Sequence, residues 1–431
     1  MSRLAFPLVL TQLAGISANV LEIMLAGHLN AAVMGAVAVG TNVWHFAAMG
    51  FIGVMMSLAP AIAQLDGAGR RGEAAEQFIQ ALWLGGAVGL AGCAMLLIFG
   101  PLLIGALGVD PGLAAEATTF LRAVSLGAPA LPMYVACRGL TEGLSMPRPS
   151  LLFGLLGLAV LAPVGWLLMF PLGLGSFGTG LALTFTLWVQ FAAFLVFVLK
   201  SPRYRDLAWP ARIPGPDRAM MWSLFRLGGP MAVSLLMESG MFSATALLIG
   251  RFGAVAVAGH QVALSVSAVT FMVPLGFAIA TTVRVGNAAG RGDLAAVRRS
   301  AATGLGLALV SQACSATLML TLPRGIAGLY TIDTEVMQFA AGLLFLAALF
   351  QLSDGAQATA SAALRGLKDA KLPMYITTIA YWAIGMPLGW FLTFPRGWGA
   401  PGMWCGLIAA LSAAAVLLWA RFLLLTAQMR R

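Results

Sequence analysis

The chain has 431 residues, of which 60% are hydrophobic and 9% are charged, and its mean hydropathy is +0.92. Soluble domains carry roughly a quarter charged residues, so this composition excludes a soluble domain, a disordered chain and a disulfide scaffold. The formal net charge is +10. Because apolar mass on this scale is solvated only by lipid, we expect a lipid-bilayer environment and no nucleic-acid partner.

Apolar runs long enough to cross a membrane follow one another along the whole chain. A hydrocarbon core needs about 20 apolar residues per helix. Runs of this kind predict twelve transmembrane helices, at residues 5–29, 33–64, 77–107, 115–141, 149–171, 178–200, 221–250, 255–288, 298–322, 335–364, 371–395 and 400–427. The sequence therefore predicts an all-α integral membrane protein. The first run is too long for a cleavable signal peptide and carries Glu22.

The distribution of Arg and Lys predicts the orientation. Of the 25 basic residues, 21 lie at the termini or in the loops that follow even-numbered spans. Cytoplasmic loops collect such residues, so both termini are expected in the cytoplasm, and contact with anionic lipid headgroups accounts for the positive charge. The excess of Arg over Lys and the high alanine content favour a bacterial inner membrane.

The second half of the chain repeats the first. The string PVGWLLMFPLGLG at 163–175 lies over PLGWFLTFPRGWG at 387–399, with eight identities in thirteen positions. The hydrophilic stretch 201–220 contains four prolines and separates the copies. We expect two pseudo-symmetric six-helix bundles, 1–200 and 221–431, joined by a cytoplasmic linker at 201–220. An even number of spans per copy makes them parallel repeats, with a substrate site between the halves.

Three acidic residues fall inside predicted spans: Glu22, Glu238 and Asp354. Each ionised acid costs about 2.5–3.5 kcal/mol at a helix centre. Such residues usually mark ion or substrate paths, although each one alone could be a protonated packing residue. Polar residues at helical spacing accompany them and form the supporting set: Asn19, Ser234, Gln357 and Ser361, with Asn42 and His45 of the second span as candidates for an N-terminal cavity.

Several strings resemble one family of transporters. They are LEIMLAG (21–27), LAPAIAQLDGAGRRGE (58–73), AGHQVALS (258–265), VRVGNAAGRGD (283–293), ALRGLKDA (363–370) and YWAIGMPLGW (381–390). On these strings the chain resembles the multidrug and toxic compound extrusion (MATE) family, in its NorM-type bacterial branch. The resemblance implies a secondary exporter of bulky, often cationic compounds, driven by inward flow of Na⁺ or H⁺. It also implies that Glu238 and Asp354 carry the coupling cation. Glu22 would match the family's first-helix acid, which is commonly Asp.

The chemistry of the acids leaves the coupling ion open. Two nearby carboxylates can bind Na⁺ together or share one proton. The resemblance favours Na⁺, but Phe350, one turn before Asp354, offers the ion no oxygen. Ser234, Gln357 and Ser361 would then complete the shell.

The sequence gives less support to other classes of function. The sequence has no phosphate-binding G-x-x-x-x-G-K-[ST] motif and no Ser/His/Asp cluster in a soluble domain, so we expect neither ATP-driven transport nor an enzyme, and no cofactor beyond the transported ion. A flippase for a lipid-linked precursor is the alternative; it would need a cationic cavity, whereas the buried charges are expected to be acidic. A channel is a third possibility, distinguished by uncoupled flux. We expect a monomer that binds small cationic and aromatic molecules.

Overall fold

The computed structural model describes residues 2–28, 31–106, 108 and 110–429, without the side chains of residues 2, 3, 19, 22, 23, 26, 27, 31 and 32. Within these residues all regular structure is helical. The longer helices are α1 (Ser2–Gly27), α2 (Ala31–Met55), α3 (Leu58–Gly67), α4 (Ala74–Ala106), α5 (Pro111–Ser125), α6 (Ala130–Gly143), α7 (Arg148–Met169), α8 (Gly175–Lys200), α9 (Arg218–Ile249), α10 (Ala254–Gly290), α11 (Leu294–Thr321), α13 (Thr334–Gly366), α14 (Lys371–Ile379), α15 (Met386–Thr393) and α16 (Ala400–Gln428). Short elements are η1 (Arg71–Glu73), η2 (Pro202–Leu207), η3 (Gly250–Phe252), α12 (Pro323–Gly328) and the π-helical η4 (Ala380–Gly385).

The twelve predicted spans correspond in order to helical segments of the structure. Among the residues that the structure describes, ten helices are long and apolar enough to cross a membrane, and the bent pair α5 and α6 makes an eleventh if it is one span. Helix α1 covers the first predicted span, with an apolar stretch at Leu4–Ala18. The expectation of an all-α membrane protein is confirmed.

Two predicted spans are interrupted rather than straight. Helices α5 and α6 meet at 47°, where the sequence indicated one span. Pro129 precedes α6 and cannot donate the backbone hydrogen bond that a continuous helix needs. A Cβ atom on Gly127 would lie 3.0 Å from the Leu187 side chain, so the break also lets the chain approach α8 closely. Between α2 and α3, the Ser57 hydroxyl donates to the Val54 carbonyl at 2.9 Å and marks a second break.

The chain forms two compact units. Residues 13–232 make one, called here the N-unit, and residues 1–12 with 233–431 make the other, the C-unit. The boundary near residue 232 falls inside α9 and not in the stretch 201–220. The division of the sequence into halves at that stretch stays a prediction.

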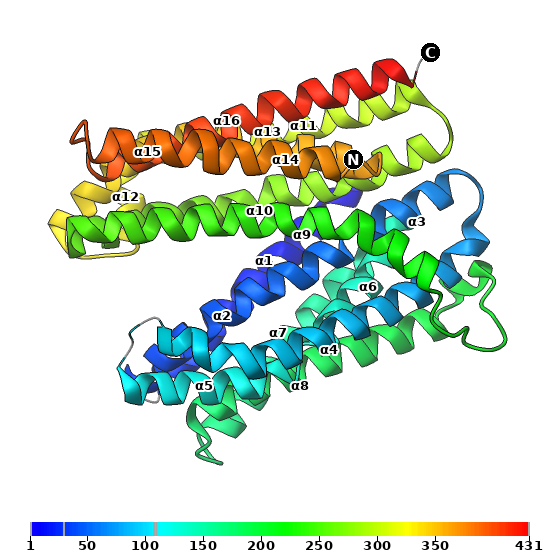
Figure 1. Ribbon diagram of the computed structural model, residues 1–431, viewed down its shortest axis with the longest axis horizontal. Coiled ribbons are helices and arrows are strands. Elements are labelled where there is room, and N and C mark those ends of the chain that lie inside the picture. The colour runs from blue at the N-terminus through cyan, green and yellow to red at the C-terminus, as the bar shows by residue number, and fades with distance from the viewer. Residues whose placement is uncertain (1, 29–30, 107, 109, 430–431) are drawn as a thin grey trace. The chain divides into compact units, whose positions relative to one another are not determined.

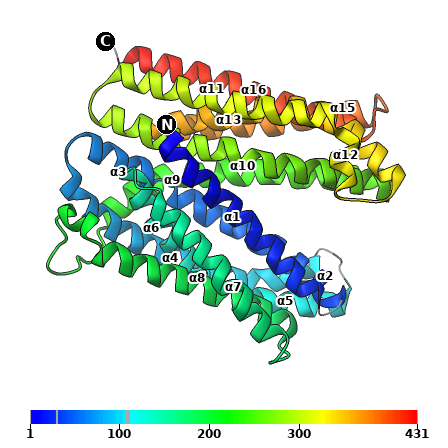
Figure 2. The ribbon, with the colours of Figure 1, turned by 180° about the vertical axis from the view of Figure 1, so that it is seen from behind.

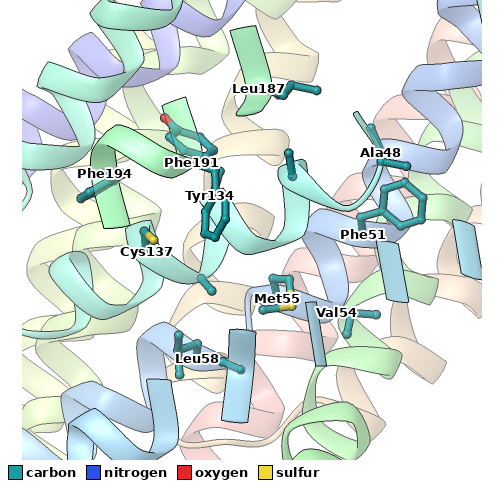
Figure 3. Packing of buried hydrophobic residues seen from close by; sticks show 14 of the residues in the cluster. Ala48, Phe51, Val54, Met55, Leu58, Tyr134, Cys137, Leu187, Phe191 and Phe194 are labelled. Atoms are coloured by element: carbon teal, nitrogen blue, oxygen red, sulfur yellow. The ribbon is translucent and has the colours of Figure 1, made fainter. Parts of the chain in front are cut away.

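The core of the N-unit is built from side chains of all the helices from α2 to α8, and Figure 3 shows the part that comes from α2, α3, α6 and α8. Phe153 and Phe194 stack with ring centroids 4.4 Å apart, and Tyr134 packs on Phe194 at 6.0 Å. Phe51 and Leu58, on the other side of the cluster, are 6% and 0% exposed. This apolar packing fixes α6, which carries charged residues discussed below.

The stretch between α8 and α9 is docked on the N-unit. The Gln80 side chain of α4 donates to the Gly215 carbonyl at 2.9 Å and accepts from the Asp217 amide at 2.8 Å. The Trp209 indole donates to the Tyr204 carbonyl at 2.7 Å. Burial raises the pKa of the Tyr204 hydroxyl to about 12, so this phenol stays neutral at physiological pH.

Many large apolar side chains are exposed on the outer faces of the helices. On α4 alone, Leu90, Ile98, Phe99 and Leu102 are each more than half exposed. In water such a surface would be an aggregation site. On a helix of this length the same side chains face lipid.

Helix α13 is the central element of the C-unit. It packs against α10, α11 and α16, and both views show α10, α13 and α16 running side by side (Figures 1 and 2). Helix α16 also packs closely on η4 and α15 through glycines. A Cβ atom on Gly406 would lie 2.5 Å from the Gly389 Cα atom and 2.6 Å from the Gly385 carbonyl oxygen. Small residues at this contact let the two backbones touch.

We predict that Gly406→Ala destabilises the protein by about 1–3 kcal/mol, because the added methyl group meets backbone and not a movable side chain. Thermal unfolding in detergent measures the effect. Gly342→Ala is the matched control, since a Cβ atom at that helical glycine meets nothing within 4 Å. Equal unfolding temperatures for the two variants would show that this contact is looser than the structure indicates.

Candidate functional site

A polar stripe runs along one face of α13. Asp354, Gln357, Ser361 and Arg365 follow one another at steps of three, four and four residues, which places them on the same side of a helix. Asp354 and Gln357 are only 5% and 4% exposed. The Gln357 amide lies 3.4 Å from the Ser361 hydroxyl. The sequence predicted the first three members of this stripe.

Glu238 and Ser234 lie on the part of α9 that belongs to the C-unit. Hydrogen bonds hold this part of α9 beside α14 and η4: the Thr377 hydroxyl lies 3.4 Å from that of Ser234, and the Trp382 indole donates to the Met237 carbonyl at 3.2 Å. Glu238 therefore faces the same neighbourhood as the stripe of α13.

The π-helical element η4 places Tyr381 between the two acidic helices. Pro387 follows η4 closely and lacks the N–H that would bond back into it, which favours an irregular turn here. Tyr381 is fully buried, and its hydroxyl accepts from the Gln357 amide at 2.9 Å. It hydrogen-bonds in turn with Glu238. A chain of donors thus runs from Gln357 through Tyr381 to the Glu238 carboxylate.

Asp354 is the second carboxylate of this site. It interacts electrostatically with Glu238, and its buried Oδ1 atom has no hydrogen-bond partner among the described residues. A buried acceptor without a partner costs free energy. Carboxylate oxygens are ligands that hard cations prefer, so this oxygen fits a bound cation or proton.

A buried cation accompanies the acids. The Nε atom of Arg365 is buried without a hydrogen-bond partner, and its guanidinium interacts electrostatically with Glu238. In the N-unit, Arg138 is also largely buried, and its Nε atom donates to Glu142 at 3.1 Å. The expectation that the buried charges are all acidic is therefore wrong. Both Arg residues lie near the end of a predicted span, where a basic residue usually indicates a cytoplasmic loop.

The remaining predicted residues lie outside this cluster. Asn42 and His45 lie about one turn apart on α2 in the N-unit, with Asn42 exposed and His45 half-buried. The side chains of Asn19 and Glu22 are outside the described residues, although both belong to α1. The structure thus brings together Ser234, Glu238, Asp354, Gln357 and Ser361, five of the nine candidates.

Aromatic packing lines the α10 and α16 side of α13. Phe350 is 2% exposed and lies 5.6 Å from Trp404 and 6.0 Å from Phe242, measured between ring centroids. His260 packs on Trp404 at 5.8 Å, and neither of its ring nitrogens has a hydrogen-bond partner among the described residues. Phe350 offers no oxygen, as expected, and supports the helix that carries Asp354.

Sequence reasoning missed Tyr381 and Arg365. Arg365 continues the spacing of the α13 stripe by one more step of four, which was a usable signal. Tyr381 carried no such signal, because its place depends on the π-helical turn.

We predict that Tyr381→Phe lowers stability by about 1–3 kcal/mol, because it leaves the buried Gln357 amide and Glu238 without their shared hydroxyl. Thermal unfolding of the purified protein measures this. Tyr375→Phe is the matched control, since Tyr375 is 57% exposed. If the two substitutions had the same small effect, the hydroxyl would contribute nothing to the buried network.

Among the described residues, no three His, Cys, Asp or Glu side chains gather as a metal site. The polar groups of the site are two carboxylates, one guanidinium and neutral oxygens. Such a set suits a weakly held monovalent cation or a proton.

Comparison with known proteins identifies the family of the chain. The MatE family model matches residues 7–167 and 230–391. A probable multidrug resistance protein NorM of Xanthomonas campestris pv. campestris is 42% identical over 97% of this chain and 92% of its own length. A multidrug resistance protein MdtK of Edwardsiella ictaluri is 35% identical over 96% of this chain and 93% of its own length.

Solved structures share the fold. The crystal structure of the eukaryotic MATE transporter AtDTX14 matches with a TM-score of 0.90 at 20% identity, over 100% of this chain and 96% of the other. An outward-facing multidrug resistance MATE transporter matches with a TM-score of 0.90 at 18% identity, over 99% of this chain and 95% of the other. With the sequence matches across both halves, these findings show that the chain is a multi-pass membrane protein of the MatE family.

Proposed function

We propose that this protein is a secondary multidrug exporter, in which inward flow of Na⁺ or H⁺ at Glu238 and Asp354 drives outward transport of lipophilic cations. The names of the NorM and MdtK relatives support the export of drugs. The observation that supports the site assignment is the buried Asp354 Oδ1 atom. It has no hydrogen-bond partner in the part of the chain that the structure describes, and it belongs to a carboxylate that interacts with Glu238.

The physical role of the acids follows from their burial. Two ionised carboxylates inside a bilayer cost about 5–7 kcal/mol on the lenient insertion scale. Binding a cation or a proton at the pair offsets part of this cost, so the loaded and empty sites differ in free energy. If ion binding changes the relative free energies of two conformations of the transporter, it shifts the equilibrium between them and so couples ion flow to transport.

The donor set is compatible with Na⁺. Both donors of the Gln357 amide point at hydroxyl groups, those of Tyr381 and Ser361, so its carbonyl oxygen is the atom that can face a cation. With Asp354, Glu238 and the hydroxyls of Ser234 and Ser361, the neighbourhood supplies the hard oxygen ligands that a small cation prefers. We therefore favour Na⁺ over H⁺.

We further propose the cellular setting. Both termini and residues 201–220 face the cytoplasm of a bacterium, in its inner membrane, because basic residues concentrate on that side. The protein acts as a monomer without a cofactor, and the two repeated halves are its functional domains. The two separate matches of the family model, at 7–167 and 230–391, support this duplication.

Expression in an efflux-deficient bacterium should lower cellular accumulation of ethidium several-fold, because buried acids attract a cation and apolar surface accepts its aromatic rings. Fluorescence of loaded cells measures this, with the Glu238→Gln/Asp354→Asn double variant at equal membrane level as the control. Unchanged accumulation would contradict the proposal, and transport of a lipid-linked sugar in its place would favour the flippase.

We predict that Glu238→Gln and Asp354→Asn each abolish gradient-driven export while the protein still folds, since each removes a charge that the membrane penalises. Dye efflux from everted vesicles, under separately imposed Na⁺ and H⁺ gradients, measures this. Glu22→Gln should weaken transport in a manner that depends on substrate or pH.

The opposite pattern of transport activity among these variants would move the coupling site. If the Glu238 and Asp354 variants kept full coupled export and the Glu22 variant lost it, the coupling site would lie in the N-terminal half and H⁺ would be the driving ion.

A further inference from the structure

The pattern Arg-Gly-Leu-x-acid occurs once in each unit, with different outcomes. In the N-unit it begins at Arg138, and the acid Glu142 lies within α6, where the two pair at 3.1 Å. In the C-unit it begins at Arg365, but α13 ends at Gly366, so the acid Asp369 falls beyond the helix.

Asp369 is engaged elsewhere. It accepts from Arg421 of α16 at 2.8 Å. Arg365 is thereby left without the partner that its counterpart in the N-unit has, and its buried Nε atom has no hydrogen bond among the described residues. A buried guanidinium nitrogen without a hydrogen bond costs free energy unless an opposite charge lies nearby.

The stripe of α13 shows where that charge is. Arg365 lies on the same helix face as Ser361, Gln357 and Asp354, and side chains on a helix lean toward its N-terminus. This lean directs the Arg365 side chain toward Ser361, and its guanidinium interacts electrostatically with Glu238. The titratable groups that interact with Glu238 are Arg365, Asp354 and Tyr381.

We propose that Arg365 is the fixed counter-charge of Glu238 and sets the Na⁺ affinity of the Glu238–Asp354 pair. Its positive charge balances one of the two carboxylates, so the site presents about one negative charge to an arriving ion. One Na⁺ neutralises it, and the repulsion from Arg365 keeps that ion weakly enough bound to be released. The inference rests on the proposed sodium coupling, and Arg365 acts as a positioning residue that does not itself bind the ion.

The first test is Na⁺ binding to the purified full-length protein, measured with isotopic Na⁺ at fixed pH. Arg365→Gln should lower the Na⁺ concentration for half-maximal binding about tenfold, because it removes a repulsive charge from a site of low dielectric constant. Arg365→Lys should restore most of the wild-type value. Arg421→Gln removes the same charge from a residue already paired with Asp369, and it should change the value less than about twofold.

The second test separates charge balance from simple packing. In Na⁺-free buffer, Arg365→Gln should unfold at a lower temperature than wild type, because Glu238 is left without its counter-charge. Adding Glu238→Gln to this variant should restore the unfolding temperature, as expected for two directly coupled residues.

Three results would overturn the inference. They are equal Na⁺ affinities of wild type and Arg365→Gln, additive effects of the two substitutions on unfolding, and a wild-type protein that binds no Na⁺. In the last case continued ethidium efflux would leave the exporter proposal standing, whereas loss of efflux would remove both.

Discussion

The C-unit is organised around the free-energy cost of keeping two carboxylates away from water. Glu238 and Asp354 sit on different helices, and each neighbour compensates part of the cost. Tyr381 and Gln357 supply a chain of hydrogen bonds, and Arg365 supplies a charge. One oxygen of Asp354 has no hydrogen-bond partner within the described ranges of the chain. The compensation by the described residues is therefore incomplete, and the proposed cation site rests on this feature.

The surrounding apolar contacts hold this site in place. Helix α16 approaches η4 and α15 closely because Gly385, Gly389 and Gly406 lack side chains, and this contact fixes the π-helical turn that presents Tyr381. On the other face, Phe350 packs on Trp404 and supports α13 one turn before Asp354. In a bilayer such close packing replaces the hydrophobic driving force between helices. The packing of these helices therefore holds in place the residues that compensate the buried carboxylates.

The helices and the acids could be predicted because their signals are local in the sequence. Hydropathy identified the spans, and the rarity of charge inside them singled out Glu238 and Asp354. The bend between α5 and α6 could not be predicted from hydropathy, which averages over Gly127 and Pro129. Arg365 was misassigned, because a basic residue near a span end is usually cytoplasmic. Tyr381 depends on where the chain winds into a π-helix, and the docking of residues 201–217 on Gln80 depends on contacts distant in sequence.

The two copies of the repeated sequence show how a small shift of a helix end changes chemistry. In the N-unit, Glu142 lies inside α6, and the Arg138 charge is neutralised within one helix. In the C-unit, α13 ends before Asp369, which lets Arg421 take that carboxylate. The guanidinium of Arg365 is then available to the acids deeper in the unit. The same pattern thus closes an ion pair within one helix in the N-unit, whereas in the C-unit it leaves Arg365 to interact with Glu238. The position of the helix end decides which of the two arrangements forms.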